Sequence, residues 1–197
     1  MSGARGTMLV VSGPSGCGKS TICNRLLEDP RVEFSVSATT RAPRPGEIDG
    51  RDYHFMDKEL FRSEIGRGAF IEWAEVHGNL YGTPRAPMER ALAAGRVFLL
   101  EVDVQGGAQL KALGLPGIYI FIAPPGMDAL RRRLELRRTD SPEVIERRMA
   151  KALEEMRASE RYDHVVVNED LDRAVAEVRR LSGLAETRAK KSSGGRA

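Results

Sequence analysis

The residues with the clearest chemistry form a glycine-rich stretch near the start of the chain. Residues 13–21 read Gly-Pro-Ser-Gly-Cys-Gly-Lys-Ser-Thr and match the pattern GxxxxGK[ST]. In this pattern the backbone N–H groups of a tight loop point at phosphate oxygens, and the loop opens a helix whose first N–H groups are also free. The lysine, Lys19, reaches the β- and γ-phosphates, and the hydroxyl of Ser20 reaches Mg²⁺. The residues expected at the phosphates are Gly13, Pro14, Ser15, Gly16, Cys17, Gly18, Lys19, Ser20 and Thr21.

The sequence on either side of this loop favours a true nucleotide site over a chance match in a glycine-rich loop. The preceding residues, Met8 to Val11, form an apolar run typical of a buried strand. The residues that follow carry an apolar face at helical spacing, made of Ile22, Cys23, Leu26 and Leu27. Strand, loop and helix therefore come in the order that the pattern requires, which predicts a nucleoside triphosphate site.

Size and composition place the chain among soluble globular proteins. Its 197 residues are enough for one domain with inserted subdomains, and no apolar run approaches the ~20 residues of a membrane span. Residues 1–7 are short and polar and do not resemble a signal peptide, so we expect a cytoplasmic protein without membrane contact. With 31 basic and 28 acidic residues the net charge is only +3, which gives little support for nucleic-acid binding.

The cysteines and histidines show no metal-binding pattern. Cys17 and Cys23 lie close together in a stiff segment, and we expect both to be reduced. The three histidines are scattered and lack ligand spacing.

Strand and helix signals alternate along the chain. Apolar runs at 97–103, 118–122 and 165–167 predict parallel strands buried on both faces. Helix starts are predicted at Thr83-Pro84 and Ser141-Pro142. Two helical stripes follow the later strands, one of Ile145, Met149, Ala152, Leu153 and Met156, the other of Leu171, Ala174, Val175, Val178 and Leu181. Together these signals predict a doubly wound α/β fold.

Two segments depart from this alternation. Residues 36–94 are rich in Gly, Pro, aromatic and charged residues and predict a small mixed insertion, whereas residues 126–158 are helical and rich in arginine. The core would then consist of residues 1–35, 95–125 and 159–188, and residues 189–197 have the composition of a disordered tail.

The insertion carries four further motifs. They are T-T-R-A-P-R-P-G-E at 39–47, D-Y-H-F at 52–55, F-I-E-W-A at 70–74 and Y-G-T at 81–83. Together with the phosphate loop, they make the sequence resemble guanylate kinase over nearly its whole length. The resemblance implies a P-loop nucleoside monophosphate kinase fold, with a parallel five-stranded core sheet, helices on both faces, a GMP-binding insertion and a helical lid. It also implies transfer of the γ-phosphate of Mg·ATP to GMP or dGMP, giving ADP and a diphosphate, as part of purine nucleotide metabolism.

The acceptor residues can be interpreted chemically as well as by resemblance. Arg41 and Arg44 offer planar donor forks that suit a monophosphate, and Tyr53 and Tyr81 could add hydroxyl donors, although such residues are more often ordinary surface and core positions. By resemblance these four residues hold the phosphate of GMP.

Glu72 stands between Ile71 and Trp73 on an apolar strand. It is either the polar face of an edge strand or a base reader, whose two carboxylate oxygens match the N1–H and amino group of guanine. Ser37 and Thr83 match positions that also bond guanine in the family.

Asp103 follows an apolar strand and begins the family's D-x-Q-G motif. Taken alone, an aspartate at this place is usually a helix cap or turn residue. The resemblance places Asp103 between GMP and the metal-bound phosphates, reaching Mg²⁺ through a water.

Arginines crowd one part of the chain, at positions 131, 132, 133, 137, 138, 147 and 148. Such a cluster is usually a solvated helix face. By resemblance, Arg133, Arg137 and Arg148 belong to a lid over the phosphates, and Asn168 lies near the adenine of ATP. The catalytic set would be Lys19, Arg41, Asp103, Arg137 and Arg148. The sequence departs from the family at Leu136-Arg137-Arg138, where Gly-Arg-Gly is common, and this leaves the hinge of the lid open.

Two alternative functions compete with this interpretation. Guanylate-kinase-like domains of scaffold proteins bind peptides without catalysis, but they typically lack an intact phosphate loop, whereas Lys19 and Ser20 are present here. A related kinase that acts on a ribose bisphosphate is disfavoured by Ser37, Glu72 and Thr83. The sequence leaves open whether the protein is a monomer or a homodimer.

Overall fold

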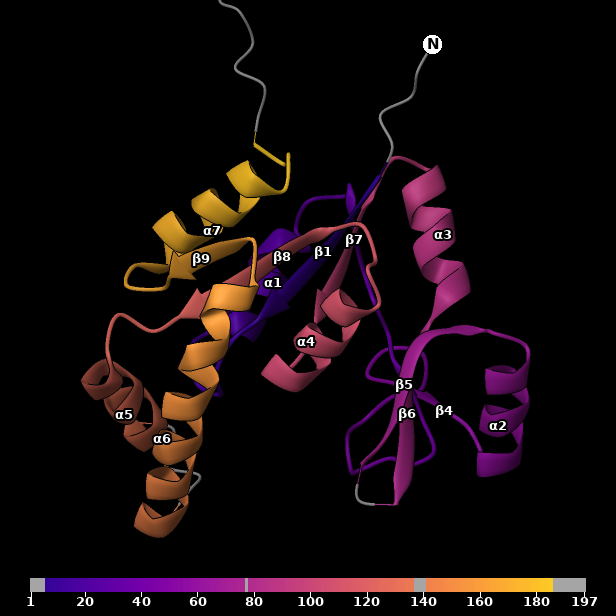
Figure 1. Cartoon of the computed structure of the whole chain (residues 1–197), viewed down its shortest axis with the longest axis horizontal. Helices are drawn as coiled ribbons and strands as arrows, with labels where there is room; N and C mark the ends of the chain where they lie inside the picture. Colours follow the sequence, from indigo (N-terminus) through magenta and orange to yellow (C-terminus); the bar gives the residue numbers. More distant parts are fainter. Residues whose placement is uncertain (1–5, 77, 137–140, 186–197) are drawn as a thin grey trace, which may run out of the picture.

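The computed structural model describes residues 6–76, 78–136 and 141–185, which form two sheets with their helices (Figure 1). The larger sheet contains β1 (Thr7–Ser12), β2 (Val32–Phe34), β7 (Val97–Glu101), β8 (Ile118–Ala123) and β9 (His164–Val167). The smaller sheet contains β3 (Ala38–Thr39), β4 (His54–Phe55), β5 (Phe70–Val76) and β6 (Asn79–Pro84). The helices are α1 (Lys19–Leu26), α2 (Lys58–Gly66), α3 (Arg85–Ala93), α4 (Val104–Ala112), α5 (Met127–Leu136), α6 (Pro142–Met156), the short 3-10 helix η1 (Arg157–Arg161) and α7 (Leu171–Leu181).

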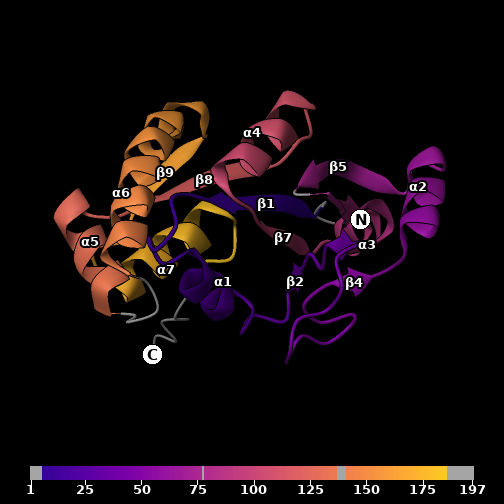
Figure 2. The ribbon, with the colours of Figure 1, turned by 90° about the horizontal axis from the view of Figure 1, so that it is seen from below.

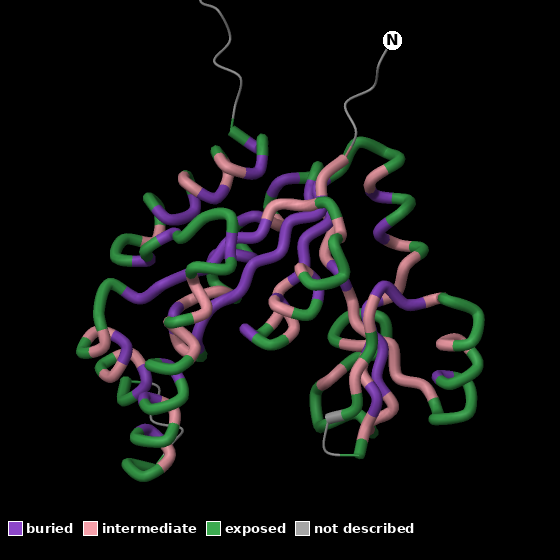
Figure 3. Tube along the Cα trace, viewed as in Figure 1, coloured by how far each residue is buried: buried purple, intermediate pink, exposed green. Residues whose placement is uncertain are grey.

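The larger sheet is parallel throughout, with strand order β2-β7-β1-β8-β9. Its central strands are apolar and buried on both faces, as the purple trace in Figure 3 shows. Helices α1 and α7 pack on one face, and α3 and α4 pack on the other (Figure 2). The predicted five-stranded α/β fold with helices on both faces is therefore confirmed.

Strand β9 differs from the prediction that it would be buried on both faces. Val165 and Val167 are 50% and 51% exposed, and in this strand only Val166 is buried. The prediction was wrong because β9 is the edge strand of the sheet, a position that an apolar run in the sequence does not reveal.

The smaller sheet has the order β4-β3-β6-β5 and mixes parallel and antiparallel pairs. It has a core of its own with α2, in which the rings of Phe61 and Phe70 stack with their centroids 4.4 Å apart. In Figure 1 this sheet and the α5–α6 pair project from the same side of the larger sheet, with α4 between them.

Two predicted helix features need correction. Thr83 is not a helix cap, because β6 continues through it and α3 begins only after Pro84. The start of α6 at Ser141-Pro142 is confirmed, although the Ser141 hydroxyl donates to Glu143 and caps no backbone N–H. Leu153 does not belong to the buried stripe of α6, since it is 54% exposed.

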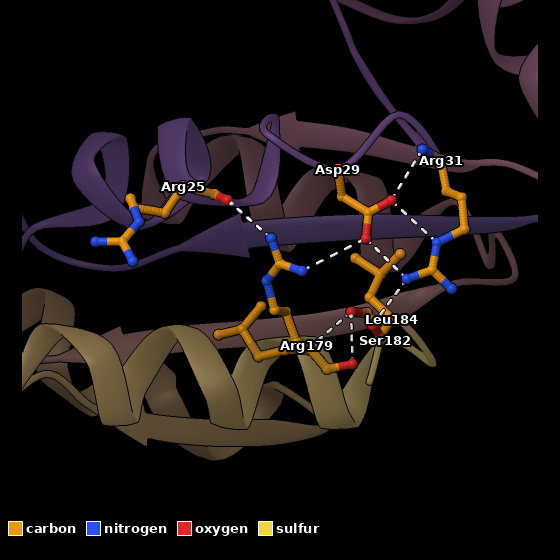
Figure 4. Close-up of polar contacts among 7 residues, drawn as sticks. Arg25, Asp29, Arg31, Arg179, Ser182 and Leu184 are labelled. Atoms are coloured by element: carbon orange, nitrogen blue, oxygen red, sulfur yellow. Dashed lines mark hydrogen bonds and ion pairs between the residues drawn. The ribbon is translucent and has the colours of Figure 1, made fainter. Parts of the chain in front are cut away.

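A buried carboxylate connects the end of α1 to the C-terminal helix α7 (Figure 4). Asp29 accepts hydrogen bonds from the Arg31 side chain at 2.8 and 3.0 Å, and Arg179 lies 3.4 Å away on α7. Arg31 also donates to the Leu184 carbonyl at 2.9 Å, and Arg179 to the Arg25 carbonyl at 3.2 Å. The bonds from Arg31 lower the pKa of Asp29 from 3.8 to about 2, and burial opposes them.

We expect Asp29→Asn to lower the free energy of unfolding by about 1–2 kcal/mol at neutral pH, allowing for screening of the partly exposed arginine. Because the pKa of Asp29 is depressed in the folded state, its contribution is complete above about pH 4 and is lost as the pH falls to about 2. Urea unfolding across this pH range measures the effect. The control is Asp172→Asn, which removes the exposed pair with Arg25 at 3.3 Å and should change stability by less than about 0.5 kcal/mol. An equal loss in both variants would contradict the prediction.

Candidate active site

The phosphate loop connects β1 to α1 in a conformation that needs glycine. Gly13, Gly16 and Gly18 have φ values of 143°, 89° and 100°, in the region that other residues rarely adopt. A Cβ on Gly13 would lie 2.2 Å from the Ile122 carbonyl oxygen, so the loop sits directly against β8. The sequence pattern therefore folds as a tight strand–loop–helix unit.

A cavity of about 510 Å³ opens above this loop. It is lined by Lys19 and Ser20 of the loop, and by Asp103 beyond β7. The Lys19 ammonium donates to the carbonyls of Gly13 and Pro14 at 2.7 and 3.0 Å. A cation and the residues of the glycine-rich loop thus border one space, which suits a polyphosphate.

Glu101 is a site residue that the sequence analysis missed. It ends β7 and lines the same cavity, and its Oε1 accepts a hydrogen bond from the Ser20 hydroxyl at 2.6 Å. Sequence held a signal for it, since Glu101 is a carboxylate at the end of a buried apolar run.

Arg133 and Asn168 hold the phosphate loop by hydrogen bonds to its backbone. The Asn168 amide donates to the Cys17 carbonyl at 2.8 Å, and Arg133 donates to the carbonyls of Cys17 at 3.2 Å and Asn168 at 2.7 Å. Asn168 is buried and packs so closely on the loop that a Cβ on Gly18 would lie 2.3 Å from its amide nitrogen. Burial raises the pKa of the Cys17 thiol, which therefore stays protonated at neutral pH.

A second cavity, of about 310 Å³, lies between the smaller sheet and α4. The predicted residues Ser37, Tyr53, Glu72, Tyr81 and Asp103 all line it. Tyr53 and Asp103 also line the phosphate cavity, so the two spaces share a wall.

Glu72 and Thr83 are direct cross-strand neighbours in the β5–β6 pair. The Thr83 hydroxyl donates to a Glu72 carboxylate oxygen at 2.6 Å. Burial raises the pKa of Glu72, and the bond from Thr83 opposes the rise. Glu72 thus stands on an edge strand, as one of the two interpretations expected, and it also lines the second cavity.

Arg41 lies beside the aromatic side chains of the smaller sheet. Its guanidinium carbon is 5.5 Å from the centroid of the Tyr53 ring, and the Tyr53 and Tyr81 rings meet edge to face at 6.1 Å. The Arg44 side chain is exposed. The structure thus brings Arg41, Tyr53 and Tyr81 together, with Arg44 on the exposed loop next to them.

Asp103 is the N-cap of α4, and its carboxylate accepts a hydrogen bond from the Gly106 N–H at 2.7 Å. The simple helix-cap interpretation is therefore correct. It does not exclude a second role, because the same carboxylate lies on the wall between the two cavities.

The arginine-rich segment forms a helix pair, α5 and α6, with a small core of its own. Arg131 pairs across the two helices with Glu146, which agrees with a solvated helix face at that position. Arg148 is half-buried on α6, whereas Arg137 lies outside the described residues. Two α6 residues that the sequence analysis did not consider, Lys151 and Glu155, line the phosphate cavity and pair at 3.5 Å.

Within residues 6–76, 78–136 and 141–185, every helix is too short or too polar to cross a membrane. In the same part of the chain no three His, Cys, Asp or Glu side chains are grouped to hold a metal ion.

Comparison with known proteins agrees with this geometry. The family model described as "Guanylate kinase" matches residues 5–182. The guanylate kinase of Symbiobacterium thermophilum is 48% identical over 178 residues, covering 90% of this chain and 84% of that protein. That of Chelativorans sp. is 52% identical over 180 residues, covering 90% and 82%. The crystal structure of guanylate kinase from Anaplasma phagocytophilum superposes with a TM-score of 0.69 at 37% identity, covering 93% of this chain and 89% of that one. The chain therefore belongs to the guanylate kinase family.

Proposed function

We propose that this guanylate kinase transfers the γ-phosphate of ATP to GMP or dGMP through the two adjoining cavities. The observation that carries the proposal is their shared wall: Tyr53 and Asp103 line both the phosphate-loop cavity and the Glu72 cavity. A donor in one and an acceptor in the other would meet at this wall. Both substrates are cytoplasmic metabolites, so we infer that the protein works in the cytoplasm.

In the transfer, an oxygen of the GMP phosphate attacks the γ-phosphorus of ATP. The bond from that phosphorus to the β–γ bridging oxygen breaks, and its electron pair stays on ADP. Such a reaction requires mainly positioning and charge stabilisation from the protein. Lys19 supplies positive charge beside the transferring group, while the backbone N–H groups of the loop, to which Pro14 contributes none, orient the donor phosphates.

The residues around Ser20 fit a magnesium ion that arrives with ATP. Mg²⁺ is bound by oxygen atoms, typically one or two carboxylates together with substrate phosphates and waters. Ser20 and Glu101, 2.6 Å apart, supply a hydroxyl and a carboxylate at the donor cavity, and Asp103 would act through a water. When bound, the ion neutralises charge on the β- and γ-phosphates.

We expect Glu101→Gln to raise the Mg²⁺ concentration needed for half-maximal activity by about tenfold, because a residue that hydrogen-bonds to a metal ligand typically changes metal affinity about 10–100-fold. Glu101 accepts a hydrogen bond from the Ser20 hydroxyl and so orients the lone pairs of the Ser20 oxygen. Activity titrations with Mg²⁺ at fixed ATP measure it, with Glu33→Gln on the neighbouring strand β2 as the control. An unchanged Mg²⁺ requirement would contradict the role of Glu101.

For the acceptor, we assign the phosphate to Arg41, Arg44, Tyr53 and Tyr81, and the guanine base to Ser37, Glu72 and Thr83. Glu72 carries most of the base selection, because guanine presents adjacent N1–H and amino donors whereas adenine does not. Thr83 occupies one oxygen of Glu72 and so fixes the carboxylate plane.

We further propose that residues 36–94 and 126–158 move over the substrates as an acceptor-binding unit and a lid around the remaining core. Closure would exclude water, which would otherwise accept the phosphate. Lys151 and Glu155 of α6 line the donor cavity, and this supports a lid formed by the α5–α6 pair. Arg133, Arg137 and Arg148 would be its charge-stabilising residues, with Asn168 near the adenine.

Removing a lid arginine should lower kcat more than it changes KM, because the group meets the phosphates fully only in the closed state. We expect Arg148→Ala to lose about tenfold or more in kcat. Its neighbour Arg147 is exposed on the same helix, and Arg147→Ala is the matched control. Steady-state kinetics on both variants, with both substrates saturated, decide the matter. Similar kcat values for the two variants would mean that the arginine cluster is only a solvated helix face.

The function is tested by a coupled assay with GMP, dGMP, AMP, CMP and UMP as acceptors. We expect rapid ADP formation with GMP, activity with dGMP, and little with the other three. A peptide-binding module without catalysis would form no ADP with any of them, which would overturn the proposal. Preference for another base would overturn the roles of Ser37, Glu72 and Thr83.

A further inference from the structure

Glu47, the last residue of the T-T-R-A-P-R-P-G-E motif, has no role in the assignments above. Its two carboxylate oxygens hold two different residues. Oε1 accepts from the Arg41 guanidinium at 2.8 Å, and Oε2 accepts from the Arg44 backbone N–H at 2.7 Å. One carboxylate therefore connects the two arginines assigned to the acceptor phosphate.

This contact is shielded from solvent. The side chains of Arg41 and Glu47 are 15% and 19% exposed, the lowest values among the Arg–carboxylate pairs of this loop region, where Arg51 and Asp52 are 61% and 35% exposed. The hydrogen bond from Arg41 lowers the pKa of Glu47, with help from the Arg44 N–H, so the carboxylate is ionised at neutral pH. In turn the bond to Glu47 raises the pKa of Arg41.

Arg41 is fixed by other contacts too. A second guanidinium nitrogen donates to the Ala42 carbonyl at 2.7 Å. The guanidinium carbon lies 5.5 and 5.9 Å from the ring centroids of Tyr53 and Phe55. The Arg41 side chain is thus held by several contacts within the protein itself.

We propose that Glu47 is a positioning residue for the acceptor phosphate. It holds the Arg41 guanidinium and the Arg44 backbone in the arrangement that receives the phosphate, and it acts on the phosphate end of GMP alone. The inference rests on the proposed role of Arg41 and Arg44. Its physical basis is preorganisation: an arginine that is already ordered loses less conformational freedom when its ligand binds.

The negative charge of Glu47 has the opposite effect on GMP binding. A carboxylate near a phosphate dianion repels it and takes up part of the positive charge of Arg41. If repulsion were the larger effect, removing the carboxylate would tighten GMP binding. The positioning role predicts weaker binding, so the sign of the change separates the two effects.

The experiment compares GMP with guanosine, which has the same base and sugar but no phosphate. Calorimetric affinities are measured for the wild-type protein, Glu47→Gln and Glu47→Ala. We expect the affinity for GMP to fall about tenfold or more in Glu47→Ala, and less in Glu47→Gln, because the amide keeps one acceptor oxygen. Guanosine affinity should stay unchanged in both variants.

Asp52→Asn is the matched control. Asp52 lies in the same insertion, accepts the Ile48 backbone N–H at 2.8 Å and pairs with Arg51 at 2.8 Å. It therefore repeats the bonding of Glu47 with an arginine that is not assigned to the phosphate, and it should leave the ratio of GMP to guanosine affinity unchanged.

Several results would overturn the inference. One is an equal loss for GMP and guanosine, which would indicate a general effect on loop structure. Another is the same GMP-selective loss in Asp52→Asn, and a third is unchanged or tighter GMP binding in both Glu47 variants. Thermal unfolding of each variant checks folding, and Glu47→Gln carries the test if Glu47→Ala does not fold. If the wild-type protein binds GMP no better than guanosine, the assignment of the acceptor-phosphate site itself is wrong.

Discussion

Lys19→Ala is expected to lower kcat by about 10²–10³ while the protein remains folded. In the proposed mechanism, the ammonium of Lys19 would offset negative charge on the transferring group in a cavity closed to water, where electrostatic stabilisation is strongest. In the structure the ammonium is bonded to the carbonyls of Gly13 and Pro14, so it is already held at the edge of the donor space. A cation that is placed before the reaction needs little reorganisation during it.

The measurement is kcat with ATP and GMP both saturating, together with thermal unfolding and ATP binding. Lys58→Ala, an exposed lysine at the start of α2, is the control and should keep full activity. Near-normal kcat in Lys19→Ala would contradict the assignment of the phosphate loop. A large loss of thermal stability would mean that the bonds to Gly13 and Pro14 matter more than the charge.

Glu72→Gln is expected to raise the KM for GMP by about 10–100-fold, the equivalent of about 1–3 kcal/mol of mismatched buried hydrogen bonding. The amide offers one acceptor oxygen, which Thr83 already uses, and it turns an N–H₂ group toward the guanine donors. ATP binding should change little. The control is Glu75→Gln, an exposed glutamate on the same strand, with its side chain on the other face.

The same substitution is expected to leave the protein as stable as the wild type, or more stable. Burial raises the pKa of Glu72 in the folded protein, so the ionised carboxylate is disfavoured by folding. The protonated carboxyl group of Glu72 therefore stabilises the folded protein at a pH below its pKa in the unfolded chain. This stabilisation is lost as the pH rises through the higher pKa of the folded protein. Loss of GMP affinity together with unchanged or higher thermal stability would identify Glu72 as a functional residue. Unchanged GMP affinity would show that the base is read elsewhere.

The parts of the structure that the sequence predicted correctly are those formed by contiguous residues. The phosphate loop is one turn between a strand and a helix, and its conformation follows from local glycines, such as Gly13 against β8. The fold class was also predictable, because buried parallel strands leave long apolar runs in the sequence. Such runs predicted four of the five strands of the larger sheet, all but the three-residue strand β2.

Where contacts join distant residues, the sequence was less informative. The bond between Ser20 and Glu101 joins the start of α1 to the end of β7, and Lys151 reaches the donor cavity only through the packing of α6. Thr83 carries a good capping side chain, but pairing with Glu72 across β5 and β6 keeps it in a strand. In these cases the tertiary structure either created a contact that no local sequence pattern encodes or overrode the local conformational preference of the residue.

Under the proposed role of Glu72, its pairing with Thr83 makes base selection depend on strand register. Side chains on β5 alternate between its two faces, so a slip of one residue against β6 would carry Glu72 out of the second cavity and turn Trp73 into it. The pairing already contains one irregularity, between Phe70 and Glu72. A single inserted or deleted residue in this hairpin would therefore abolish recognition of guanine while every residue of the phosphate loop stayed in place, so donor and acceptor recognition can be lost independently.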